Sequence, residues 1–207
     1  MASLYERWVL PHVINCACAS KPIRYQRRKI VPRASGRVLE LGVGGGLNLA
    51  FYDPARVTSV TGVDPSEGLR RKALAAPRPD GLRVDVHDGT AEALPFDDDA
   101  FDEVVCTFTL CSVASPAAAL AEARRVLKRG GTFWFSEHGL SPDAEVRRWQ
   151  QRLEPFWKPI AGGCHLTRPV GASIVAAGFD LVEHEHMYLP GTPRALGWAE
   201  WGRARPT

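Results

Sequence analysis

Three glycines at alternate positions, Gly42, Gly44 and Gly46, follow a short apolar run that contains the carboxylate Glu40. A dinucleotide-binding loop needs the spacing G-x-G-x-x-G, and Leu47 stands where its third glycine belongs. A carboxylate at the end of the preceding strand would repel a pyrophosphate, whereas it would attract a ligand that carries an ammonium or a sulfonium group. The loop therefore indicates a cationic cofactor and argues against a nicotinamide dinucleotide.

Two further acids end the next two apolar runs of the chain. Asp64 follows the β-branched run 57–63, and Asp88 follows the alternating run 82–87. Acids at the carboxyl ends of strands accept hydrogen bonds from ribose hydroxyls in nucleotide-binding folds, so we assign this role to Asp64. We expect Asp88, with Gly89 and Thr90 behind it, to hold an adenine.

Candidate catalytic residues follow the later strands. Cys111 comes after the run 101–110 and either faces the transferred group or packs as a small apolar side chain. His138 comes after the run 132–137 and is either a base that orients a second substrate or a structural histidine. These two residues are the catalytic candidates.

The remaining cysteines and aromatic residues suggest a lid but no metal site. The pair Cys164-His165 lacks a partner pair at zinc-ligand spacing, so we expect no metal ion. Trp149, Phe156 and Trp157 recur at helical spacing in the segment after the fifth strand. We expect them to form a lid over the second substrate.

The elements that must position these residues alternate along the chain. Strand patterns cover 37–41, 57–63, 82–87, 101–110, 132–137, 179–189 and 196–205, and helix patterns cover 47–52, 66–76, 116–127, 143–157 and 170–177. Such alternation predicts an α/β fold with a Rossmann-like, doubly wound, seven-stranded sheet. The connection between the last two strands is too short for a crossover helix, so we expect a mostly parallel sheet with an antiparallel last strand.

Charge is concentrated at the N-terminus. Residues 1–33 carry seven Lys or Arg residues against Glu6 alone, although the formal net charge of the chain is only +3. We predict that residues 1–35 form a basic helical lid segment and that residues 36–207 form the main domain. The basic segment could make weak peripheral contact with an anionic membrane. A nucleic-acid partner is not expected, because it would need a wider basic surface.

Composition places the chain among ordinary globular proteins. Its 207 residues are 45% hydrophobic and 24% charged, which suits a single folded unit. No apolar run approaches the roughly 20 residues that span a bilayer, and the five cysteines contain no C-x-x-C pair. We therefore expect a cytoplasmic protein with reduced thiols, whose only membrane contact is peripheral.

Four motifs in a fixed order connect these observations to a family. They are VLELGVGGG, TGVDPS, DGTAEALPFDDDAFDEVV and RVLKRGGTFWFSEH. Through them the sequence resembles the class I S-adenosylmethionine-dependent methyltransferases over residues 36–206. The resemblance implies S-adenosyl-L-methionine as cofactor and S-adenosyl-L-homocysteine as product. It also implies the cofactor-binding residues Glu40, Gly42, Gly44, Gly46, Asp64, Pro65, Asp88, Gly89, Thr90, Ala91, Glu92 and Thr107.

A closer resemblance rests on segments outside the general cofactor motifs. CTFTLCSV, the pair Glu137-His138, WQQRLEPFW and GCHLTR resemble the methyltransferase-like seven proteins, which are alkyl-thiol methyltransferases. That resemblance implies a small-molecule acceptor, favouring a lipophilic thiol. The N-terminus departs from the family, which carries a hydrophobic anchor where this chain is short and basic. Amine or phospholipid N-methylation, and binding of the cofactor without methyl transfer, remain the alternatives.

Overall fold

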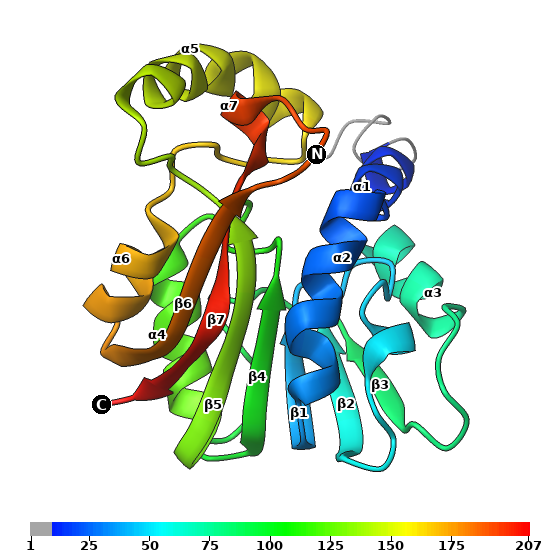
Figure 1. Ribbon diagram of the computed structural model, residues 1–207. Coiled ribbons are helices and arrows are strands. Elements are labelled where there is room, and N and C mark those ends of the chain that lie inside the picture. Colours follow the sequence, from blue (N-terminus) through cyan, green and yellow to red (C-terminus); the bar gives the residue numbers. More distant parts are fainter. Residues whose placement is uncertain (1–9) are drawn as a thin grey trace.

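The computed structural model describes residues 10–207, and within them one seven-stranded sheet forms the centre of the molecule (Figure 1). Its strand order is β3-β2-β1-β4-β5-β7-β6. Strands β1 to β5 run parallel, whereas β7 is antiparallel to both of its neighbours, β5 and β6. The strands are β1 (Gly36–Leu41), β2 (Val57–Val63), β3 (Val84–His87), β4 (Phe101–Thr107), β5 (Leu127–His138), β6 (Phe179–Tyr188) and β7 (Trp198–Pro206). The predicted architecture, including the antiparallel last strand, is confirmed.

Helices cover both faces of the sheet and its upper edge (Figure 1). The α-helices are α1 (Leu10–Cys18), α2 (Lys21–Ile30), α3 (Glu67–Leu74), α4 (Pro116–Val126), α5 (Ala144–Ile160), α6 (Val170–Ala176) and α7 (Arg194–Gly197), and two short 3₁₀ helices are η2 (Val31–Arg33) and η3 (Leu49–Phe51). Serine caps begin two helices: Ser66 and Ser115 accept hydrogen bonds from the backbone N–H of the third residue of α3 and of α4. Within the described residues, none of these helices has the length and apolar character needed to cross a membrane.

Two hydrophobic clusters pack against the two faces of the sheet. The larger one joins β1, β4 and β5 to α4 and α6, with Leu120 and Ile174 fully buried. The other joins the opposite face to α2 and η2 through Ile30 and Val31, which have no exposed surface. Helix α2, predicted as part of a lid segment, is therefore packed into the core. The sequence boundary at residue 35 stays a prediction.

Local differences from the expected elements have identifiable causes. The segment 47–52 is not a full helix, because it folds as a turn and η3 around buried hydrogen bonds from Asn48 and Tyr52. Strand β5 begins five residues earlier than expected, at Leu127, and crosses a bulge at Gly130, whose φ is +78°. The last connection forms the short helix α7 before β7 begins.

Candidate active site

The glycine loop after β1 is a tight backbone turn beneath helix α1. Gly42, Gly44 and Gly46 have φ values of +63°, +54° and +76°, a region that disfavours other residues. A side chain on Gly42 would lie 2.6 Å from a methyl carbon of Thr109, because the loop touches the turn after β4. Gly46 lies against α3 and does not line the cavity described below. Gly42 and Gly44 therefore leave the backbone of the loop open to the cavity.

Asp64 connects the loop to the end of β2. Its two carboxylate oxygens accept hydrogen bonds from the backbone N–H groups of Gly44, at 3.0 Å, and of Ser66, at 2.8 Å. Asp64 is 6% exposed, and burial raises the pKa of its carboxyl. Each oxygen keeps a free lone pair, as a carboxylate provides about four acceptor positions. Asp64 can therefore hold the glycine loop and accept hydrogen bonds from a ribose at the same time.

Glu40 lies behind the glycine loop rather than in the cavity wall. The Tyr52 hydroxyl donates to its Oε2 at 2.8 Å, and Nδ2 of Asn48 donates to its Oε1 at 2.9 Å. Burial raises the pKa of Glu40 to about 7, against these hydrogen bonds and the nearby Arg27, which lower it. The predicted direct contact of Glu40 with a cofactor is therefore not supported by its position, because Asn48 and Tyr52 occupy both of its oxygens behind the loop.

Helices α1 and α2 contribute two polar residues to the cavity wall that the sequence patterns did not reveal. Arg27 lines the cavity, is 6% exposed and donates hydrogen bonds to Asn48 and Thr107, while its Nε has no partner. Asn15 lies against Gly45, and its buried Oδ1 also has no partner. Unpaired buried polar atoms are costly, so both groups are suited to a polar ligand. Arg27 belongs to the basic run of the predicted lid segment.

Residues after β3 divide between the cavity and the solvent. Thr90, Ala91 and Glu92 line the cavity, as does Pro65 after β2. Asp88 does not line it, because its exposed carboxylate forms an ion pair with Arg70 of α3. Gly89 also lies outside the lining. Of the residues predicted after β3, the structure therefore brings Thr90, Ala91 and Glu92 to the cavity, but not Asp88 or Gly89.

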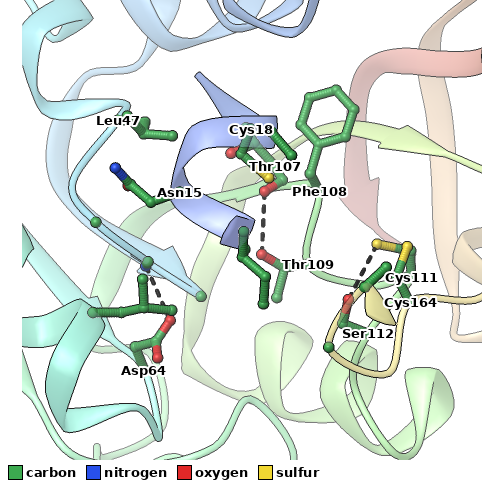
Figure 2. A pocket seen from close by; sticks show the side chains of 18 of the residues that line it. Asn15, Cys18, Leu47, Asp64, Thr107, Phe108, Thr109, Cys111, Ser112 and Cys164 are labelled. Carbon is green, nitrogen blue, oxygen red and sulfur yellow. Dashed lines mark hydrogen bonds between the residues drawn. The ribbon is translucent and has the colours of Figure 1, made fainter. Parts of the chain in front are cut away.

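One cavity of about 830 Å³ joins these groups to the predicted acceptor site. Figure 2 shows Asp64 and Leu47 on one side, Cys111, Ser112 and Cys164 on the other, and Thr109 between them. Its lining includes the predicted residues Gly42, Gly44, Asp64, Pro65, Thr90, Ala91, Glu92, Thr107, Cys111 and His138. Within the described part of the chain, the lining contains no lysine and no tyrosine. A cavity of this size and continuity suits a nucleoside cofactor beside a second molecule.

Buried side chains organise the loop after β4. Oε1 of Glu137 accepts hydrogen bonds from the backbone N–H groups of Thr109, at 2.7 Å, and Leu110, at 3.1 Å. Arg168, in the loop after α5, donates hydrogen bonds to the carbonyl oxygens of Leu110 and Val113. Segments CTFTLCSV, Glu137-His138 and GCHLTR, which are far apart in sequence, therefore meet in one place. Glu154 of WQQRLEPFW joins them by accepting hydrogen bonds from 165–167.

The predicted catalytic pair lies at this end of the cavity. Nε2 of His138 is 2.7 Å from Sγ of Cys164, and Cys111 lies beside both. A hydrogen bond with Cys164 and burial raise the pKa of the Cys111 thiol well above its usual value. As a free thiol, Cys111 is therefore neutral at physiological pH and is a poor nucleophile.

The aromatic lid is only partly formed as expected. Trp157 lines the cavity, but Trp149 and Phe156 are 51% and 74% exposed and lie outside its lining. Helix α5 turns one face to the cavity, and the two residues project from another. Only Trp157 of the predicted trio therefore belongs to the cavity wall.

Comparison with known proteins places this site in a family. A family model described as a methyltransferase domain matches residues 39–135. The chain is 39% identical over 171 residues to the rat thiol S-methyltransferase TMT1B. This alignment covers 78% of this chain and 69% of the relative. The human TMT1B is 38% identical over 177 residues, or 80% of this chain and 72% of the relative. The chain belongs to the methyltransferase family. It is an S-adenosylmethionine-dependent enzyme.

A solved structure supports the same fold. An S-adenosylmethionine-dependent methyltransferase from Mesorhizobium loti superposes with a TM-score of 0.64 at 20% identity, over 86% of this chain and 95% of that chain. The residues present also fit the cofactor: Arg27 and Asn15 offer unpaired polar atoms, Asp64 offers free acceptor positions, and Gly44 exposes the backbone. The unpaired polar atoms and free acceptor positions of the cavity therefore suit the carboxylate, ammonium and ribose groups of S-adenosylmethionine.

Proposed function

We propose that this methyltransferase acts on a small molecule, and that the acceptor is a lipophilic thiol. The observation that carries the proposal is the composition of the acceptor end of the cavity. Apolar and sulfur-containing side chains line it, including Val113, Trp157, Leu189 and Leu196 beside Cys111 and Cys164. An apolar acceptor gains free energy by leaving water for such a surface.

The absence of lysine and tyrosine from the described lining also favours a thiol. An alcohol needs a strong base before it can attack a methyl group, whereas a thiol ionises near pH ~8.5 and supplies its own nucleophile. The thiol S-methyltransferase activity named for the rat and human relatives agrees with this choice.

The chain's own residues align the reactants. When bound, S-adenosylmethionine supplies an electrophilic methyl group. Asp64 and Gly44 hold the nucleoside side, while the turn at Thr109 and Leu110, fixed by Glu137, separates this side from the acceptor end. Trp157 and Leu189 restrict water at the acceptor end. Alignment and exclusion of water are the main requirements of an in-line methyl transfer.

A panel of acceptors tests the proposal directly. The full chain is incubated with methyl-labelled S-adenosylmethionine and with alkyl thiols, aryl thiols, amines, phenols or phosphatidylethanolamine vesicles. We expect labelled methyl thioethers from the lipophilic thiols, at rates that fall when a charged group is added to the thiol. Rapid labelling of an amine or a phospholipid without labelling of any thiol would replace the thiol assignment with N-methylation.

A further inference from the structure

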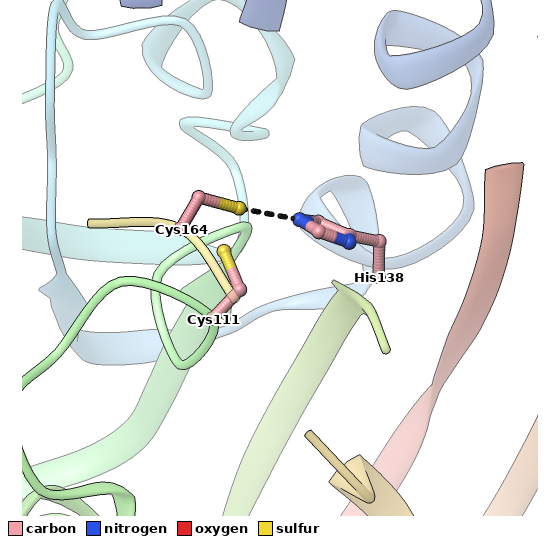
Figure 3. A group of neighbouring side chains, drawn as sticks. All are labelled: Cys111, His138 and Cys164. Carbon is pink, nitrogen blue, oxygen red and sulfur yellow. Dashed lines mark hydrogen bonds between the residues drawn. The ribbon is translucent and has the colours of Figure 1, made fainter. Parts of the chain in front are cut away.

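Two thiols and one imidazole form a compact cluster in the wall of the acceptor end (Figure 3). Sγ of Cys111, Sγ of Cys164 and a ring nitrogen of His138 all lie within 4.8 Å of one another. The closest pair is Nε2 of His138 and Sγ of Cys164, at 2.7 Å. Three ligand atoms of the kinds that bind zinc therefore surround one point beside the cavity.

The three side chains come from separate segments that hydrogen bonds fix in place. Cys111 follows β4, His138 ends β5, and Cys164 lies in the loop after α5. The backbone N–H of His165 donates to the carbonyl oxygen of Cys111 at 2.8 Å, which joins the first and third segments. Nη2 of Arg168 adds a hydrogen bond of 2.6 Å to the carbonyl oxygen of Val113. Supporting contacts of this kind orient ligands before a metal arrives.

The composition and burial of the cluster favour a soft divalent cation. Cys111 and Cys164 are 2% and 7% exposed, and the described cluster includes no carboxylate. Two thiolates balance the charge of one divalent ion, so the loaded site would carry no net charge into the buried wall. Sulfur and imidazole ligands select zinc over calcium or magnesium, which take oxygen ligands.

We infer that Cys111, His138 and Cys164 bind one Zn²⁺ ion, whose fourth position receives the sulfur of the acceptor. This inference rests on the thiol assignment proposed above. Zinc–sulfur and zinc–nitrogen bonds of about 2.3 and 2.0 Å place tetrahedral ligand atoms roughly 3.5–3.8 Å apart. The three ligand atoms are now between 2.7 Å and at most 4.8 Å apart. Changes of about 1 Å in these distances would therefore give a tetrahedral arrangement. Three protein ligands with one open position are typical of catalytic zinc sites.

The zinc ion makes the acceptor a bound thiolate near neutral pH. The acceptor sulfur replaces a water molecule on the ion, and its S–H proton passes to solvent. A sulfur electron pair then forms the new bond to the methyl carbon, while the bond from that carbon to the sulfonium breaks. The electrons of the broken bond stay on the sulfur of S-adenosyl-L-homocysteine. The product thioether is a weak ligand and leaves the metal.

No zinc pattern is visible in the sequence, because the three ligands are distant from one another along the chain. Cys164 has His165 as its neighbour, but His165 contacts Glu154 instead of the cluster. The expectation of no metal was based on paired ligand spacing, which this arrangement does not use.

Metal analysis tests the site independently of activity. Full-length protein is purified without chelators, reduced, dialysed and measured for bound metal, and Co²⁺ is then substituted for its optical spectrum. We expect one zinc per chain and the sulfur-to-cobalt charge-transfer and visible bands of a tetrahedral thiolate site. Cys111→Ser and Cys164→Ser should each lose at least tenfold in metal affinity. Cys16→Ser, which removes an exposed thiol of α1, should keep the full stoichiometry.

Adding an alkyl thiol to the cobalt protein tests the open position. A stronger charge-transfer band, reporting a third sulfur ligand, supports the inference. No bound metal in reduced, folded protein, or a Cys111–Cys164 disulfide in place of the metal, overturns it. Thiol methylation by such metal-free protein would overturn the zinc site while leaving the thiol assignment intact. A cobalt spectrum that thiols do not change, in a protein that methylates only amines, would overturn both.

Discussion

Nη1 of Arg27, in helix α2, donates a hydrogen bond of 2.8 Å to Oδ1 of Asn48, beside the glycine loop. The same nitrogen reaches Thr107 at the end of β4. The N-terminal region thus supplies a buried cation to the cavity wall. Arg27 is the buried arginine of α2, whereas the other arginines of this helix, such as Arg24, are exposed.

Replacing Arg27 tests this use of the N-terminal region. Arg27→Met should weaken binding of both S-adenosyl-L-methionine and S-adenosyl-L-homocysteine by tenfold or more, because a lost hydrogen bond to a charged group costs about 1.5–3 kcal/mol. Calorimetry with both ligands measures the change. Arg24→Met is the matched control and should bind normally. Equal affinities in the two folded variants would remove Arg27 from the cofactor site.

Asp64 and Asp88 provide a second matched pair. Asp64→Asn should weaken cofactor binding by about tenfold. A carboxylate accepts hydrogen bonds at both oxygens, from Gly44, Ser66 and a ribose, whereas the amide has only one accepting oxygen. Asp88→Asn should change it less than twofold, because Asp88 is exposed and paired with Arg70. Equilibrium dialysis compares the two variants. A larger loss from Asp88→Asn would show that the loop after β3 rearranges to bind adenine.

Glu40 should make the stability of the free enzyme depend on pH. Its pKa of about 7 in the folded protein exceeds the ordinary value of 4.5, so folding takes up a proton between these values. The free energy of unfolding therefore falls as pH rises through this window, by about 3 kcal/mol in total, and levels off above it. Glu40→Gln should remove this fall.

Urea unfolding between about pH 5 and pH 8 measures the effect. Glu67→Gln, at an exposed position of α3, is the control and should keep the wild-type slope. If Glu40→Gln and Glu67→Gln lose stability equally as the pH rises, Glu40 is not the group responsible.

Arg168 should affect the acceptor more than the cofactor. Its guanidinium holds the carbonyl oxygens of Leu110 and Val113, so Arg168→Met should loosen the acceptor-side loop. We expect the KM for a thiol to rise about tenfold, with cofactor affinity changed less than twofold. Steady-state kinetics and calorimetry separate the two effects, and Arg152→Met on α5 serves as control. A loss of cofactor affinity alone would contradict this role.

Much of the fold follows from local patterns in the sequence. Alternating strands and helices specify the doubly wound sheet, and the short connection before Trp198 specifies its antiparallel end. The helix predicted after Gly46 does not form, because the side chains of Asn48 and Tyr52 turn inward and donate hydrogen bonds to Glu40. Such tertiary hydrogen bonds leave no periodic signal.

The end of a strand predicts several of the residues that line the cavity, but not Asp88, whose exposed carboxylate pairs with Arg70. Asp64, Thr107 and Cys111 line the cavity, and they lie at or just after the carboxyl ends of β2 and β4. Arg27 and Asn15 enter from another layer, and a helical arginine in a basic run resembles an exposed one until its packing is known. The proximity of Cys164 to Cys111 and His138 likewise depends on how the loop after α5 folds back.

Methyl transfer to a defined thiol would show whether the acceptor is the proposed one. Purified full-length protein, a lipophilic alkyl thiol and methyl-labelled S-adenosylmethionine are combined, and the methyl thioether is quantified by mass spectrometry against an enzyme-free reaction. We expect stoichiometric formation of the thioether and S-adenosyl-L-homocysteine, with Asp64→Asn at least tenfold slower when the cofactor is limiting. Thioether formation no faster than in the enzyme-free reaction, by protein that binds the cofactor and methylates an amine or phospholipid, would contradict the thiol assignment.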